Sequence, residues 1–200
     1  MKKIFLSLSL VCLFSLCGCS LGDAVMSETT QYLVSAIGFD CKNSEIITNI
    51  EAVVVNSEEP EEEIHALLFE GKGKTLKKSV ENALSKAQKP LSLSHCALLI
   101  LGENMNPQKL SEVCDFVFDT EQITVSVAFV ESENAEKLLS LEPVSSVTVG
   151  YDIVSLLETQ SKRKNIGFRN RYFEIEQRRC ENKAQKKLPF IKISGKKYSL

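Results

Sequence analysis

The sequence predicts an α/β (α+β) domain in which a mixed β-sheet of about four to five strands packs with helices. Short runs rich in β-branched residues, such as residues 31–40 and 45–56, have the composition of strands. Residues 76–89 instead carry an apolar stripe with helical spacing. The composition agrees with a folded domain, because 44% of the 200 residues are hydrophobic.

The first 18 residues are predicted to be a lipoprotein signal peptide. A lysine pair precedes an apolar run that is too short to cross a bilayer, since a spanning helix needs about 20 apolar residues. The run ends in Leu16-Cys17-Gly18-Cys19, a bacterial lipobox, in which cleavage falls before Cys19 and its sulfur carries a diacylglycerol. We therefore predict lipidation at Cys19, a lipid-anchored N-terminus and a polar tether at residues 19–30. An uncleaved N-terminal anchor and a plain secretory signal are the alternatives.

The first strands are predicted to form an antiparallel hairpin. Residues 31–40 and 45–56 flank a short polar turn, which favours direct pairing of the two runs. The acidic segment at residues 57–63 is interpreted as a solvated loop, because it lacks the Asp/Asn alternation and the glycine of a calcium loop. Residues 63–70 then predict a third strand.

The segment Gly71-Lys72-Gly73-Lys74-Thr75 resembles a phosphate-binding loop only in part. The first glycine of that motif would fall at position 68, where this chain has Leu68. We predict a glycine turn instead, with Thr75 capping the helix at residues 76–89.

The next segments complete a domain at residues 31–160. The continuous apolar run at residues 96–101 is typical of a strand covered on both faces. Asn106-Pro107 is a favourable helix start. The remaining predicted elements are a strand at residues 123–130, a short helix at 133–141 and a helix that ends near residue 159.

Residues 161–200 form a strongly basic segment. They hold 13 Lys and Arg against 3 Asp and Glu, a net charge of +10, and since the whole chain carries −2, residues 1–160 carry −12. Contact with anionic lipid would contribute about 1 kcal/mol per basic residue near the surface. Export and lipidation argue against nucleic acid. We favour a solvated face, the start of a truncated second domain, or a partner contact.

The sequence predicts no catalytic residue, no cofactor and no metal site. His65 lies within a predicted strand, and a metal site needs several ligands. His95 follows Ser92 and Ser94, but the GxSxG nucleophile elbow is absent. Four cysteines of the mature chain besides Cys19 are widely spaced without a CxxC pair, which favours buried free thiols, although an exported chain could form disulfides; they are Cys41, Cys96, Cys114 and Cys180.

A series of short motifs resembles the Ger(x)C family, the lipoprotein C subunits of nutrient germinant receptors in endospore-forming bacteria. In chain order the matching segments are the lipobox, Ala36-Ile37-Gly38-Phe39-Asp40, Glu70-Gly71, Thr75-Leu76, Leu93-Ser94-His95, Leu99-Ile100-Leu101-Gly102-Glu103, Asp115-Phe116, Glu121 with Ile123, Ala135-Glu136-Lys137-Leu138-Leu139 and Leu188-Pro189. Members of the family usually continue through two more domains, so the resemblance implies a short member that matches mainly the N-terminal domain.

The resemblance implies a non-enzymatic lipoprotein on the outer face of the spore inner membrane. Its partners would be the integral-membrane A and B subunits of the receptor, and its role would lie in spore germination. An envelope solute-binding or structural lipoprotein unrelated to sporulation is the alternative. The sequence indicates neither the germinant nor the residues that contact a partner.

Overall fold

The structure is a computed structural model that describes residues 31–54, 65–164 and 170–200. The signal peptide, Cys19, the tether and the acidic segment at 57–63 lie outside the described residues, so the predictions made for them stay predictions.

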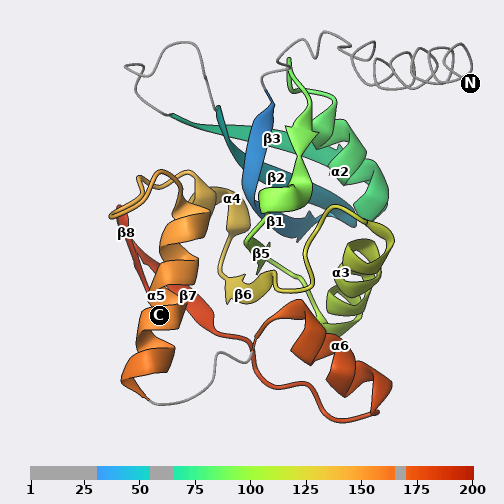
Figure 1. Cartoon of the computed structure of the whole chain (residues 1–200). Coiled ribbons are helices and arrows are strands. Elements are labelled where there is room, and N and C mark those ends of the chain that lie inside the picture. Colours follow the sequence, from blue (N-terminus) through green and yellow to red (C-terminus); the bar gives the residue numbers. More distant parts are fainter. Residues whose placement is uncertain (1–30, 55–64, 165–169) are drawn as a thin grey trace, which may run out of the picture.

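A mixed sheet forms the centre of the described fold (Figure 1). Its eight described strands run in the order β3-β2-β1-β5-β6-β7-β8, with β4 paired to β1. Neighbours β1, β5, β6 and β7 are parallel, whereas β1–β2, β2–β3 and β7–β8 are antiparallel. The strands are β1 Tyr32–Lys42, β2 Glu45–Val54, β3 Ala66–Gly73, β4 Leu91–Ser92, β5 Leu98–Leu101, β6 Ala128–Ser132, β7 Phe190–Ser194 and β8 Lys197–Ser199.

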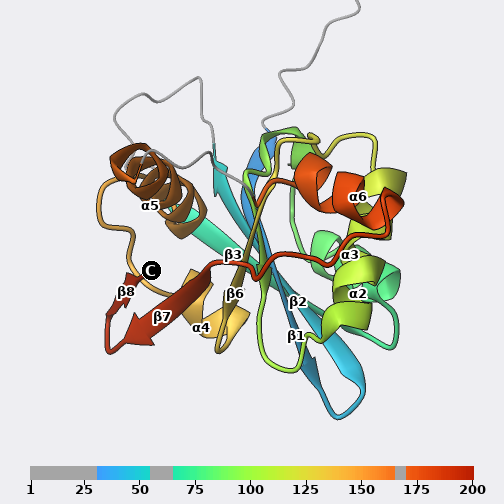
Figure 2. The same ribbon diagram turned by 90° about the horizontal axis from the view of Figure 1, so that it is seen from below.

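Helices cover both faces of the sheet (Figure 2). Helices α2, α3 and α6 pack on one face, and α4 and α5 pack on the other. The side chains of β5 alternate between the two, because Leu99 and Leu101 belong to the first core and Leu98 and Ile100 to the second. The helices are α2 Leu76–Leu84, the 3-10 helix η1 Leu93–His95, α3 Pro107–Asp119, α4 Ala135–Leu139, α5 Val149–Arg163 and α6 Tyr172–Cys180.

The mixed α/β class is confirmed, and so are several local predictions. β1 and β2 form the expected antiparallel hairpin, with both Asn43 and Ser44 in left-handed conformation at its turn. All four residues of β5 are buried, as expected for a strand covered on both faces. The side chains of Thr75 and Asn106 accept hydrogen bonds from the third residues of α2 and α3, so both cap predictions are confirmed.

The predicted glycine turn is wrong in detail, because Gly71 and Gly73 belong to β3 itself. A Cβ atom on Gly71 would lie 2.2 Å from the backbone nitrogen of Ala83. These glycines therefore let α2 lie directly on the strand, and the bend falls at Lys74 and Thr75.

The sheet has more strands than the four to five expected. The two-residue β4 and the hairpin β7–β8 account for the difference, since short strands carry little periodicity. β6 starts at Ala128 instead of residue 123, because turns occupy the preceding residues. In these turns the backbone N–H of Ile123 donates to the carbonyl of Thr120, and that of Val127 donates to the carbonyl of Thr124. Likewise α2 ends at Leu84 and not at residue 89.

The basic segment at 161–200 contributes to the same sheet and core. β7 pairs with β6, and Tyr172 and Ile175 of α6 pack in the core beside α2 and α3. A domain boundary near residue 160 stays a prediction.

Candidate functional site

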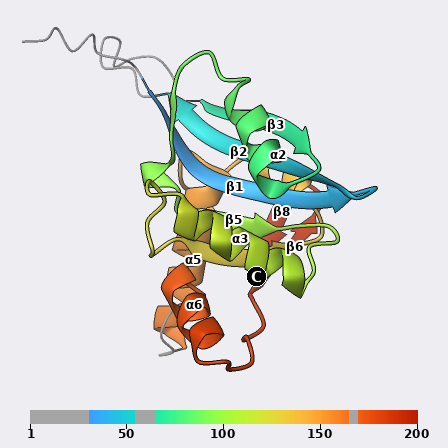
Figure 3. The ribbon, with the colours of Figure 1, turned by 90° about the vertical axis from the view of Figure 1, so that its right-hand side faces the viewer.

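The carboxyl ends of β5 and β6 form a topological switch point in the sheet. From β5 the chain continues to α3 on one face, and from the neighbouring β6 it continues to α4 on the opposite face. Because the two connections diverge, a crevice opens between them, and ligands of open α/β sheets bind in such crevices. In Figure 3 these strand ends lie on the side opposite to the start of β1.

The crevice at this point has a volume of about 520 Å³. Ser132 is only 4% exposed, and its hydroxyl has no hydrogen-bond partner among the described residues. Glu131 is the one ionisable side chain among the described residues that line the crevice. The lining residues are Leu101, Gly102, Asn104, Met105, Asn106, Glu131, Ser132 and Phe190.

Asp40 holds in place the two connections that border the crevice, from β5 to α3 and from β6 to α4. Its carboxylate is buried at the end of β1 and accepts hydrogen bonds from the backbone N–H groups of Glu103 at 2.7 Å, Ala135 at 3.0 Å and Glu136 at 3.1 Å. A Cβ atom on Gly102 would lie 2.0 Å from Asp40 Oδ1, so only glycine admits this approach. Three separate motifs of the Ger(x)C resemblance therefore meet at one carboxylate.

Glu51 plays the same role for α5. Its buried side chain accepts hydrogen bonds from the backbone N–H groups of Val149 at 2.8 Å and Gly150 at 2.9 Å, at the first turn of the helix. The Ser35 hydroxyl donates a third bond at 2.7 Å. Burial raises the pKa of Glu51 more than these hydrogen bonds lower it.

Asp152 joins α5 to β8 and to the loop before the helix. The hydroxyl of Tyr198 donates to Asp152 at 2.6 Å, and the backbone N–H groups of Val144 and Ser145 also donate to it. Burial alone would raise the pKa of Asp152, but the hydrogen bonds outweigh it and lower the pKa to about 2. The same contact raises the pKa of Tyr198, after the larger effect of its burial.

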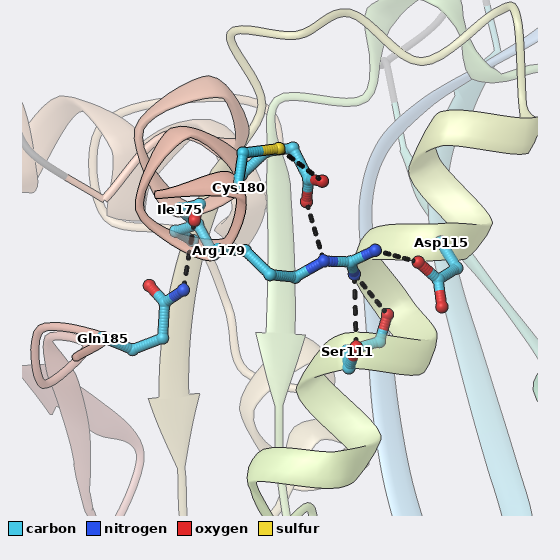
Figure 4. A network of polar contacts seen from close by, with 7 residues as sticks. Ser111, Asp115, Ile175, Arg179, Cys180 and Gln185 are labelled. Atoms are coloured by element: carbon cyan, nitrogen blue, oxygen red, sulfur yellow. Dashed lines mark hydrogen bonds and ion pairs between the residues drawn. The ribbon is translucent and has the colours of Figure 1, made fainter. Parts of the chain in front are cut away.

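A polar network joins α3 and α6 on the other face (Figure 4). The Arg179 guanidinium lies 2.5 Å from a carboxylate oxygen of Asp115 and also contacts Glu176 at 3.4 Å and the Ser111 hydroxyl at 3.2 Å. The hydrogen bond to Asp115 is the main cause that raises the pKa of Arg179. Cys114 lies beside this network, and burial, followed by the charge of Glu176, raises its pKa to about 12.

An apolar groove of about 480 Å³ lies between α2 and α3. Its apolar lining includes Leu76, Val80 and Phe116, whereas Glu81 and Asp119 are among the acidic residues at its sides. Phe118 of α3 does not line the groove, and its side chain is 79% exposed. Large exposed apolar surfaces are typical of interaction sites.

The hydrogen bonds of Ser92, Ser94 and His95 do not form a catalytic triad. The Ser92 and Ser94 hydroxyls lie 2.8 Å apart and bond to each other, and the backbone carbonyl of His95 accepts from Tyr151 at 3.2 Å. His65 is exposed just before β3.

The four described cysteines are free thiols, but the expected burial is wrong for Cys180, which is exposed, and for Cys41, which is half-buried. Cys96 and Cys114 are buried, and burial raises the pKa of Cys96 to about 12. Within residues 31–54, 65–164 and 170–200, no cluster of three or more His, Cys, Asp or Glu side chains is arranged to hold a metal ion. None of the helices in these ranges is long and apolar enough to span a bilayer.

Sequence reasoning missed the three buried carboxylates and the crevice. A usable signal existed for two of them, because Asp40 directly follows the apolar run of β1 and Glu51 interrupts the β-branched run of β2. An acid inside a strand that is otherwise apolar needs a partner when it is buried. The helix N–H groups that bind these two carboxylates, however, come from residues 95 to 99 positions later in the chain, and the Glu103 N–H that binds Asp40 comes from 63 positions later.

The fold and these contacts define a mixed α/β domain whose buried carboxylates join its elements to one another. Residues 29–192 match the spore germination protein N-terminal domain, and the chain belongs to this family of spore germination proteins. The resemblance to the Ger(x)C family is thereby confirmed. No curated protein and no solved structure matches the chain.

Proposed function

We propose that this protein is a lipid-anchored, non-enzymatic subunit of a spore nutrient germinant receptor. It acts in germination through contacts with the integral-membrane A and B subunits. The observation that carries the proposal is the match of residues 29–192 to the spore germination domain, which spans all the described elements up to the middle of β7.

Two features of the structure support a role that depends on protein contacts. The groove between α2 and α3 offers an apolar surface whose lining also holds acidic residues and Lys77, and Phe118 is exposed separately on α3. The buried carboxylates Asp40, Glu51 and Asp152 are each occupied by hydrogen bonds from the protein itself, so they act as structural anchors.

The lipobox supports attachment to the outer face of the spore inner membrane. Tyr32 starts β1 thirteen residues after Cys19, and a chain of this length spans at most about 45 Å when fully extended. A lipid on Cys19 would therefore keep the domain close to the bilayer, within reach of integral-membrane subunits. Two acyl chains are sufficient for stable anchoring.

Deletion of the gene tests the receptor role. We expect spores of the deletion strain to lose the response to at least one nutrient germinant, and a copy of the wild-type gene to restore it. Normal germination of the deletion strain with every nutrient would contradict the role.

Replacement of Cys19 tests the anchor separately. We expect Cys19→Ala to release the protein from the membrane fraction, whereas Cys17→Ala leaves it there. Full membrane retention of Cys19→Ala would show that a partner or the basic segment holds the protein.

The alternative of an envelope lipoprotein unrelated to sporulation is not proposed, because the chain belongs to a family of spore germination proteins.

A further inference from the structure

The helices α2, α3 and α6 lie side by side in one layer over the sheet, and the apolar groove opens between the first two (Figure 1). We propose that this groove binds a basic amphipathic helix of a partner protein, which places its apolar side on α2 and its lysine or arginine side chains along α3. The proposal rests on the receptor role proposed above and deepens it, because it names the chemistry of the partner segment.

The shape of the groove suits a helix. Leu76, Val80 and Leu84 follow one another at every fourth residue along α2 and form a continuous apolar strip. Since a helix rises about 1.5 Å per residue, this strip is about 12 Å long. An incoming helix with anchors at i, i+3, i+4 and i+7 needs about 10 Å, so the groove accommodates two turns of a helix laid along α2.

The floor of the groove is apolar and already formed. Leu76 and Val80 are 6% and 3% exposed, so the surrounding core holds them in place. Leu84 and Phe116 are half-buried against the same core, and Phe116 makes an edge contact with Phe39 at 6.2 Å. Because the half-buried side chains keep apolar surface in contact with water, a helix that covers them is stabilised by burial without first ordering the site.

The two walls of the groove differ in charge. The α3 wall holds three carboxylates, those of Glu112, Asp115 and Asp119, whereas Lys77 and Glu81 balance each other on the α2 wall. The described residues that line the groove therefore carry a net charge of −3. This difference sets both the chemistry and the orientation of the partner, because basic side chains beside an apolar stripe would meet the α3 wall.

The cations that pair with the α3 carboxylates come from outside the groove lining. Lys109 bonds to Glu112 at 2.8 Å and Arg179 to Asp115 at 2.5 Å, whereas none of the ion pairs seen among the described residues includes Asp119. Exposed pairs of this kind are weak because water screens them, and an ionised carboxylate accepts several hydrogen bonds. Incoming lysine or arginine side chains therefore find acceptors on this wall.

The contact between α6 and α3 shows how a basic helix engages α3. Tyr172 and Ile175 of α6 pack in the core, while Arg179 reaches the Asp115 carboxylate and the Ser111 hydroxyl (Figure 4). The partner helix would repeat this combination in the groove, with apolar residues on the floor and basic side chains on α3.

Peptide binding to the full chain tests the proposal directly. The probe is a fluorescent amphipathic peptide of about 14 residues, made of leucine and lysine, with its leucines on one side of the helix. One control peptide has glutamate in place of lysine, and another has the same composition in an order that forms no apolar stripe. Binding is measured by fluorescence anisotropy with the chain in phosphatidylcholine nanodiscs, and empty nanodiscs give the blank.

We expect the basic peptide to bind saturably and the acidic peptide to bind at least about tenfold more weakly, because its charges face the α3 carboxylates. The peptide without a stripe should show no saturable binding. Equal affinity for the basic and the acidic peptide, or for the basic peptide and its shuffled form, would overturn the proposal.

Variants locate the binding on the groove. The double variant Glu112→Gln and Asp119→Asn should weaken binding of the basic peptide about tenfold, because each exposed charge contributes a factor of about three. Leu84→Ala should weaken it about fivefold, since it removes part of the apolar strip. An unchanged circular dichroism spectrum shows that each variant is folded.

The matched control removes the same amount of charge from the opposite face. Glu133 and Glu142 are exposed on either side of α4 and do not line the groove, so Glu133→Gln with Glu142→Gln should leave the affinity unchanged. Equal affinities of the two double variants would contradict the site. A dimer of the chain that Leu84→Ala dissociates would mean that a second copy fills the groove, which would also overturn the proposal.

The outcome of these measurements is separate from that of the receptor role. Peptide binding is measured without spores, so saturable binding together with normal germination of the deletion strain would support the groove and contradict the receptor role. Loss of germination in the deletion strain without binding of the basic peptide would support the receptor role and contradict the groove.

Discussion

The two faces of the sheet are held to their helices by different forces. On the face of α2, α3 and α6, the contact is a continuous apolar core that includes Phe39, Leu99 and Phe129. On the face of α4 and α5, apolar residues also pack, but Asp40 and Glu51 fix the first turns of both helices with hydrogen bonds.

For α4 the difference follows from the length of the helix, whereas α5 has fifteen residues and its length does not explain the contact with Glu51. α4 has five residues, and a helix this short is not stable by itself because its nucleation costs more than its few hydrogen bonds return. A buried carboxylate that accepts its first N–H groups compensates for this cost. α3 has thirteen residues and an apolar stripe, so packing alone can position it.

Neighbouring residues of β1 allow the two faces to be compared by mutation, and Phe39→Ala should have the largest effect. Phe39 is fully buried on the apolar face and packs edge-on against Phe116, with ring centres 6.2 Å apart. We expect a loss of about 4 kcal/mol in the free energy of unfolding, measured with urea, because truncation leaves a cavity. A loss below about 2 kcal/mol would mean that this core can collapse around the gap.

Asp40→Ala tests the opposite face one residue further on. It removes the acceptor of three backbone N–H groups, so we expect a loss of about 3 kcal/mol in the same urea experiment. Glu103→Gln is the control, because it keeps the backbone bond and changes only an exposed ion pair with Lys42. If Asp40→Ala cost no more than this control, the carboxylate would not hold α4.

The contrast between the faces also explains what the sequence could predict. Apolar stripes and runs are periodic, and they predicted α2, α3, β1, β2 and β5 with small errors at the ends. Caps are local, so Thr75 and Asn106 were also identified.

The carboxylate contacts could not be predicted in the same way. Asp40 and Ala135 are 95 positions apart, and no local pattern joins them. The crevice depends on which face each connection takes after β5 and β6, which is a property of the whole topology. The family resemblance marked motifs at these positions, but it did not show that they meet at Asp40.

Tyr198→Phe tests the third carboxylate and should have a smaller effect. It removes the 2.6 Å hydrogen bond to Asp152 at the edge of the sheet, so we expect a loss of about 1 kcal/mol at neutral pH. The pKa of Asp152 is lowered from 3.8 to about 2, so its contribution is complete above pH 3.8 and is lost as the pH falls towards 2.

The difference in stability between wild type and Tyr198→Phe should therefore shrink across this acid range, as measured by urea unfolding at several pH values. Tyr151→Phe is the control, since the Tyr151 hydroxyl bonds to the backbone of His95 and not to a carboxylate. A difference that stays constant with pH would show that the Tyr198 bond does not depend on the charge of Asp152.

Arg179→Ala should have the smallest effect, although its network is the most extensive polar contact between α3 and α6 in Figure 4. The Arg179 side chain is 38% exposed and its partner Asp115 is 57% exposed, so water screens the pair. Exposed ion pairs contribute about 0.2–1 kcal/mol, and we expect a loss of about 0.5 kcal/mol in the free energy of unfolding. High salt should reduce this loss further, whereas the loss in Phe39→Ala should persist. A loss as large as that of Asp40→Ala would mean that polar contacts hold the helices on both faces, and the distinction between the faces would then not hold.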